Sequence, residues 1–283
     1  MTGIVCALCC LVLAALNDFV FKLFAGGSHS RGLFVAIIGV VWLLALLALP
    51  VSPDTNWHTT LLWGTISGIF SAGGNILLIE AMSKESVGLC SLIYRLNMVP
   101  VVIGAAILFG EEPSGPQYFG IGFAVAAVLL FQLGLNDKFS LRRIAGAGLW
   151  MVILASLMRA GMGLSYKYAF LHGADKNAVA QLNSLFWIAG GVVYALVRER
   201  KNLSLDRKLL GIGALSGVLV AGIVLFMAWS LAYGDASVVL PIAQMSFVLT
   251  FILGVVFLHE KFYRRQLFAM AFGIAAVIWL AVG

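Results

Sequence analysis

The sequence predicts an all-α membrane protein whose ten transmembrane helices form two inverted five-helix repeats. Three observations carry this prediction. The chain of 283 residues is 62% hydrophobic and only 11% charged, with a mean hydropathy of +1.04, which leaves too little polar surface for a soluble globule. It contains ten apolar stretches of membrane-spanning length. Residues 88–132 also resemble residues 237–281 at a constant offset of about 149 residues, so one unit occurs twice.

A helix needs about 20 mostly apolar residues to cross a bilayer. These stretches should be helical because a spanning segment must satisfy its own backbone hydrogen bonds, and they are too long and too uniformly apolar for barrel strands. We expect the first span to be retained, because it contains Asp18 and Lys22 and no small-residue cleavage site follows it. The expected spans are residues 3–24, 33–50, 59–82, 86–109, 117–135, 145–171, 178–197, 208–233, 235–258 and 266–282.

The ten spans divide into two repeats of five. The first repeat covers residues 1–135, the polar loop 136–144 connects the halves, and the second repeat covers 145–283. Because five is an odd number, the second repeat enters the membrane from the opposite side. Inverted repeats of this kind are typical of transporters.

Positive charge is confined almost entirely to one side of the expected topology. That side holds the loops after odd-numbered spans, and Lys176 alone lies on the other. The odd-side residues are Arg31, Lys84, Lys138, Arg142, Arg143, Arg198, Arg200, Lys201, Arg207, Lys208, Lys261, Arg264 and Arg265. The positive-inside rule places these loops in the cytoplasm and both termini outside. The net charge of +6 then contacts anionic lipid headgroups and not nucleic acid. We expect a multi-pass protein of a bacterial cytoplasmic (inner) membrane.

Signatures of enzymes and of cofactor sites are absent from the sequence. It has no GxxxxGK[ST], HExxH or GxSxG motif, and its short loops leave no room for a soluble catalytic domain. The cysteines all lie within expected spans and are interpreted as small packing residues; they are Cys6, Cys9, Cys10 and Cys90. We therefore expect no enzyme activity, cofactor or metal, and any active transport must draw on an ion gradient or on the gradient of the substrate.

Small residues and prolines indicate how the helices pack. Pro100 and Pro241 fall in the repeat-related fourth and ninth spans, where they either kink gating helices or form simple tolerated kinks. The third and eighth spans each carry a small-xxx-small pair, typical of close helix contacts in membranes; the pairs are Gly64 with Gly68 and Gly213 with Gly217.

Both copies of the repeat run as an apolar helix, a glutamate, a short polar turn and a second apolar helix. The best-matching motifs are AAILFGEE at 105–112 and LGVVFLHEK at 253–261. With ten short-looped helices, the whole chain resembles the drug/metabolite transporter superfamily of the EamA type. The resemblance implies a secondary carrier in which helices 1, 3, 4, 6, 8 and 9 surround a central cavity and helices 5 and 10 are peripheral. It also implies cytoplasmic termini, opposite to the loop charges. Glu111 and Glu260 are expected to be structural residues bordering the headgroups.

Charged residues inside the spans are the first candidates for a site, because a charge at the centre of a membrane helix costs about 3 kcal/mol. Arg95 and Arg159 fall near the midplane and are expected to line the substrate site, with a structural ion pair as the alternative. Lys22 and Lys167 lie closer to their helix ends, where the alternative is an ammonium that snorkels to the interface.

Asp18 and Glu80 are the candidates for proton coupling. Asp18 is four residues from Lys22 and so shares its helix face, and Glu80 falls near the same side of the membrane. Carboxylates in a low-dielectric cavity have a raised affinity for protons, as a proton-coupled carrier requires. The alternative is a static network of Asp18, Lys22 and Glu80 that closes the cytoplasmic mouth.

Subtracting these two acids from the four cations leaves a surplus of two positive charges in the spans. Guanidinium groups match carboxylate or phosphate oxygens, so we expect a small anionic or zwitterionic metabolite as substrate. Aromatic residues such as Tyr166 and Trp187 are more typical of interface belts and packing.

The alternatives to a metabolite transporter are a flippase for a lipid or lipid-linked headgroup, a structural membrane protein or an intramembrane enzyme. Further expected partners are membrane lipids and, as an open possibility, a second copy of the chain. Neutral contacts to the substrate are expected from Asn75, Tyr94, Asn97, Trp229 and Gln244.

Overall fold

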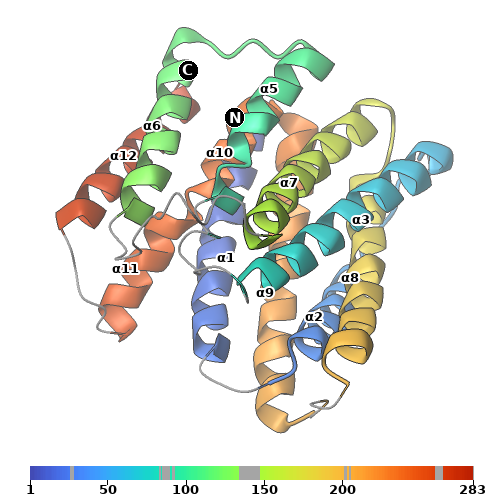
Figure 1. The fold of residues 1–283 in the computed structure, drawn as a ribbon. Helices are drawn as coiled ribbons and strands as arrows, with labels where there is room; N and C mark the ends of the chain where they lie inside the picture. Colours follow the sequence, from blue (N-terminus) through green and yellow to red (C-terminus); the bar gives the residue numbers. More distant parts are fainter. Residues whose placement is uncertain are drawn as a thin grey trace.

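Helices make up all the regular structure in the described part of this computed structural model, which covers residues 1–25, 29–82, 84, 90, 93–133, 147–200, 203, 205–258 and 264–282. Six helical stretches are long and apolar enough to cross a membrane, and four shorter ones are also apolar, which confirms the predicted all-α architecture (Figure 1). In chain order the helices are α1 (Thr2–Ala25), α2 (Arg31–Leu46), α3 (Trp57–Met82), α5 (Met98–Phe109), α6 (Gly115–Leu133), α7 (Ala147–Leu171), α8 (Lys176–Arg198), α9 (Arg207–Tyr233), α10 (Ala236–Gln244), α11 (Ser246–Leu258) and α12 (Arg264–Val282).

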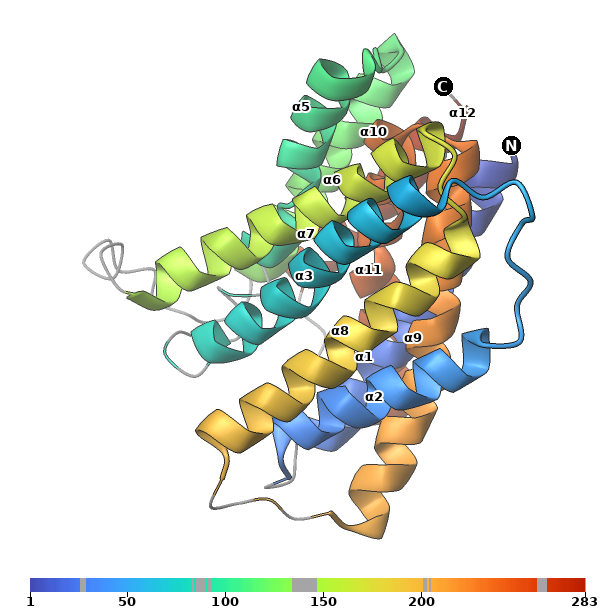
Figure 2. The ribbon, with the colours of Figure 1, turned by 90° about the vertical axis from the view of Figure 1, so that its right-hand side faces the viewer.

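The helices of the two halves pair in a symmetric pattern. The second helices of the two repeats, α2 and α8, pack on each other, as do the fifth helices, α6 and α12. The first helix of each repeat packs on the third helix of the other, in the pairs α1 with α9 and α7 with α3. This arrangement is the one expected of inverted repeats related by a pseudo-two-fold axis. The start of α1 and the end of α12 lie at the same end of the bundle (Figure 2), as an even number of spans requires.

Glycines permit the closest of these helix contacts. A Cβ atom added to Gly191 of α8 would lie 2.6 Å from the backbone nitrogen of Ala36 in α2, so the two backbones touch at this point. The predicted packing glycines also contact neighbouring helices, which supports their structural interpretation. Gly64 and Gly68 face Leu182 and Phe186 of α8, and Gly213 and Gly217 face Ile37 and Val41 of α2.

The fourth and ninth spans are broken in the middle, whereas the sequence predicted continuous helices over 86–109 and 235–258. In the ninth span, α10 ends at Gln244 and α11 begins at Ser246. In the fourth span, the short helical segment 93–95 is followed by a turn at 96–97 before α5 begins. The two breaks fall at the same place in the repeat, because positions 96 and 245 are separated by the repeat offset.

Shortened backbone hydrogen bonds mark both breaks. Val99 donates to the oxygen of Leu96 and Val248 to that of Met245, each at 3.0 Å, and both are bonds across three residues instead of four. Pro100 has no N–H to offer the Leu96 oxygen, which explains the shorter bond in the fourth span. Pro100 therefore accompanies an interruption of its span, whereas Pro241 lies within α10, ahead of the break at Met245.

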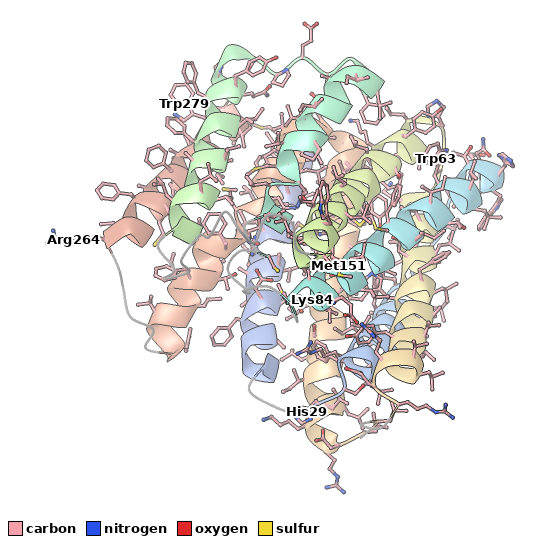
Figure 3. All side chains as sticks on the ribbon, viewed as in Figure 1. His29, Trp63, Lys84, Met151, Arg264 and Trp279 are labelled. Atoms are coloured by element: carbon pink, nitrogen blue, oxygen red, sulfur yellow. The ribbon has the colours of Figure 1, made fainter. Side chains whose placement is uncertain are left out.

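The pair α6 and α12 lies at the periphery, as the resemblance implied. Figure 3 shows Trp279 and Arg264 of α12 on the outer side of the bundle. Trp279 packs on Phe119 of α6, with ring centroids 5.8 Å apart. The remaining helices enclose the interior in which the polar residues gather.

Candidate functional site

A cavity of about 260 Å³ lies between the two halves, beside the two helix breaks. Its walls come from α1, α3, the broken fourth span, α7, α8, α9 and α10. Six of the residues predicted for the site line it, and they come from both repeats: Asp18, Asn75, Tyr94, Arg95, Arg159 and Gln244. A cavity at the interface of inverted repeats is the usual position of a transporter's substrate site.

Arg95 is held in the cavity by a carboxylate and by exposed backbone. Its Nη2 forms an ion pair of 2.9 Å with Asp18, and its Nη1 donates to the main-chain oxygen of Gln244 at 3.0 Å and to Ser246 Oγ at 3.3 Å. The guanidinium also lies 5.5 Å from the ring centroid of Phe247. Among the described side chains the charged partner of Asp18 is Arg95; the side chain of Lys22, which the sequence suggested, lies outside the described residues. Arg95 adds no net charge to the cavity.

Arg159 has no such compensation. Its only hydrogen-bond partner among the described residues is the sulfur of Met162, at 3.5 Å, and a thioether is a weak acceptor. None of the ion pairs in the described part of the chain includes Arg159. Its five N–H donors thus have no oxygen partner among the described residues, so of the described side chains this is the one whose electrostatics favour an anion in the cavity.

Neutral polar groups complete the lining. The amide of Asn75 donates to the oxygen of Ser71 at 2.8 Å, and Trp187 donates to the hydroxyl of the same serine at 2.7 Å. Gln244 donates to Asn97 Oδ1 at 3.2 Å. Asn97 is buried outside the cavity lining, where it joins the broken fourth span to the broken ninth, so it positions Gln244 and was wrongly expected to line the site.

Lys167 also lies outside the cavity lining, in a buried network that the sequence did not predict. Its ammonium donates to the oxygen of Gly234 at 2.7 Å and lies 3.6 Å from Glu111. Glu111 in turn accepts hydrogen bonds from the backbone of Ala236 and Ser237, at 3.0 and 2.9 Å, at the start of α10. The structural interpretation of Glu111 therefore stands, but this residue is buried at a helix N-terminus and does not border headgroups. Glu260 lies outside the described residues.

Two further candidates, Glu80 and Trp229, lie apart from the cavity lining. Glu80 faces α8 and forms a two-point contact with Arg198, at 2.8 and 3.1 Å. Trp229 donates to Asn177 at 3.4 Å and does not reach the cavity lining. The side chain of Lys22 lies outside the described residues.

Tyr166 and Trp187 line the cavity, although the sequence analysis assigned both to belts or packing. The Tyr166 hydroxyl is fully buried and has no hydrogen-bond partner in the described structure. One sequence signal points to Tyr166: it follows Arg159 by seven residues, two helical turns, and so shares its face. No comparable signal exists for Trp187, because its position depends on how α8 packs against α3.

Comparison with known proteins extends the likeness to the whole chain. The sequence model of the EamA-like transporter family matches residues 1–133 and, a second time, 146–282. A crystal structure of a protein superposes with a TM-score of 0.82 at 14% sequence identity, covering 99% of this chain and 96% of the other; at this identity the likeness concerns the fold. No protein of curated function matches at a significant level.

Proposed function

The chain belongs to the EamA-like transporter family, and on that premise we propose that it is a secondary active carrier of a small anionic or zwitterionic metabolite. Membership of this family makes it a multi-pass membrane transporter. The proposal adds three things: the substrate, the coupling to protons or to another gradient, and a location in a bacterial cytoplasmic membrane.

One observation carries the choice of substrate, namely Arg159 in the cavity without a carboxylate partner. The sequence suggested a surplus of two positive charges, but Asp18 neutralises Arg95, and Lys167 is engaged by Glu111 outside the lining. Among the described side chains the remaining cation is Arg159, which is half-buried, and a partly desolvated charge without a counter-ion is costly. An anionic group of the substrate removes that cost on binding.

The broken spans supply a route to alternating access. The interrupted fourth and ninth spans meet beside the cavity, where Asn97 and Gln244 bond across the repeats. Discontinuous helices at a repeat interface are the elements against which transporter halves rock. Asp18 lines the cavity and is 33% exposed in its side chain, which supports it over Glu80 as the group that takes up a coupled proton.

Charge movement in proteoliposomes tests the proposal. Reconstituted protein is given concentration jumps of propionate and of alanine, and the current is compared with that of Arg159→Gln. The matched control is Arg198→Gln, because Arg198 lies at the exposed end of α8. We expect current from the wild type and from the control, and its loss in Arg159→Gln. Lipid crossing of a headgroup-labelled phospholipid without any soluble uptake would instead support the flippase alternative and overturn the proposal.

A further inference from the structure

Tyr166 and Arg159 together leave two hydrogen-bonding groups unmatched on one wall of the cavity. The hydroxyl of Tyr166 is fully buried without a partner, and leaving a buried hydroxyl unsatisfied is unfavourable. Arg159 stands two turns earlier on the same face of α7, and its guanidinium contacts Met162, which lies between the two residues along the helix. Both side chains line the cavity, so an acceptor lying between them would satisfy both.

The charge of the lining restricts what that acceptor can be. Among the described side chains that line the cavity, those ionised at neutral pH are Asp18, Arg95 and Arg159. Asp18 and Arg95 neutralise each other at 2.9 Å, and the described part of the lining therefore carries one net positive charge. A monoanion brings the occupied cavity to neutrality, whereas a zwitterion leaves one positive charge and a dianion adds one negative charge. In a low-dielectric site the neutral complex has the lowest desolvation cost.

We propose that the substrate is a small monocarboxylate, with its carboxylate held between the guanidinium of Arg159 and the hydroxyl of Tyr166. This inference rests on the proposed transport function and narrows its substrate class. The charge of Asp18 is already matched by Arg95, and its Oδ2 accepts from Arg95 and from Thr250 Oγ1, so a substrate ammonium would meet no net negative charge there. Tyr166 is thereby a specificity-determining residue, because its O–H favours a substrate that places an acceptor oxygen, such as that of a carboxylate, beside it.

Binding of two matched series to the purified full-length protein tests the charge rule. The first series is propionate, alanine, methylmalonate and propionamide; the second is phenylacetate, phenylglycine, phenylmalonate and phenylacetamide. Within each series the carbon frame is nearly constant and the charge is that of a monoanion, zwitterion, dianion or neutral molecule. Titration calorimetry in detergent measures the dissociation constants. In at least one series the monoanion should bind about 10-fold or more tightly than its three relatives, as expected for one desolvated charge-assisted contact.

Substitutions test the two residues. Tyr166→Phe removes only the hydroxyl and should weaken monoanion binding about 10-fold, and it should weaken binding of the neutral amide less, because the amide oxygen carries no full charge. Arg159→Gln should abolish the preference for the monoanion. Tyr168→Phe is the matched control; this residue is on the same helix and packs on Trp63 and His172 away from the cavity lining, so binding should not change.

Several results would overturn the inference. The inference is contradicted if the zwitterion or the dianion binds more tightly than the monoanion in a series that binds. It is also contradicted if Tyr166→Phe binds the monoanion with wild-type affinity, or if neither monoanion binds to the wild type. Failure of the transport proposal has a different signature. If alanine binds and drives current while propionate does not, transport stands and the monocarboxylate inference fails; if no soluble probe moves and labelled lipid crosses, the transport proposal fails.

Discussion

Arg95 donates a hydrogen bond of 3.0 Å to the main-chain oxygen of Gln244, the residue that occupies its own place in the second repeat. That oxygen is available because the ninth span is broken. In a continuous helix Val248 would donate to it, but Val248 donates to Met245 instead. Since the same guanidinium binds Asp18, one side chain joins α1, the fourth span and the break in the ninth.

Replacing Arg95 with Gln should therefore destabilise the protein. The change leaves Asp18 without its counter-ion and the Gln244 oxygen without a donor. Because the Arg95 side chain is only 18% exposed, the loss should lie between that of a surface pair and that of a buried one, at about 2 kcal/mol. Thermal unfolding in detergent measures it. Arg198→Gln is the control, with a 58% exposed arginine and an expected cost below about 1 kcal/mol; equal losses in the two variants would contradict the role of Arg95.

Lys167 and Glu111 should show strong energetic coupling. Each single replacement, Lys167→Met or Glu111→Gln, leaves a buried group that lacks its main partner, at a cost of about 3 kcal/mol. The double variant should be more stable than the sum of the two losses predicts, by at least about 1 kcal/mol. Unfolding midpoints of the four proteins complete the cycle.

Lys176→Met is the matched control for this cycle, because the ammonium of Lys176 packs over the ring of Tyr233 near the surface of the bundle. Combined with Glu111→Gln, it should give additive losses. Additive behaviour of Lys167 and Glu111 themselves would mean that their 3.6 Å approach contributes nothing to stability.

Gly191→Val should prevent α2 and α8 from packing. The added Cβ would lie 2.6 Å from the nitrogen of Ala36 and 2.8 Å from the oxygen of Gly32, and backbone atoms cannot move aside as a flexible side chain can. We expect a loss of more than about 3 kcal/mol, seen as aggregation during size-exclusion chromatography. Gly122→Val is the control, since nothing lies within 4 Å of its Cβ position; a monodisperse Gly191→Val protein would show that the contact can relax.

The sequence was sufficient for the fold because the bilayer imposes one simple rule, that a spanning segment must be apolar and helical. Span number and the doubled unit follow from hydropathy and from the repeat, and the resemblance to the EamA type implied the peripheral place of α6 and α12. The helix breaks did not follow, because Pro100 and Pro241 are compatible with a kink or an interruption. Which of the two occurs depends on partners such as Arg95, which binds the carbonyl that the break exposes.

The site was predictable only in part, because depth along a span says little about the direction in which a side chain points. Arg95 and Arg159 were found from their depth, and both line the cavity. Lys167 was a candidate as a charge within a span, with snorkelling as the alternative, yet it turns toward Glu111 and α10. The rotation of a helix depends on its contacts with neighbouring helices, such as the one that puts Trp187 beside Ser71. A hydropathy pattern does not predict those contacts.

Proton coupling, if it runs through a cavity carboxylate, should depend on Asp18 and not on Glu80. Asp18 lines the cavity with Arg95 and Thr250 as its neighbours, and its protonation would release the guanidinium that joins α1 to the two broken spans. Glu80 is bound to Arg198 outside the cavity lining. In proteoliposomes, Asp18→Asn should reduce accumulation driven by a pH gradient by at least about 10-fold while exchange without a gradient persists.

Glu80→Gln should keep the accumulation driven by a pH gradient. Asp235→Asn serves as the control, since it removes a carboxylate that is 66% exposed and lies 3.8 Å from Lys167, outside the cavity lining. If accumulation of the substrate survives Asp18→Asn and disappears in Glu80→Gln, the coupling carboxylate is Glu80, at the end of α3. That result would also mean that the ion pair of Asp18 with Arg95 has only the structural role that joins the helix breaks.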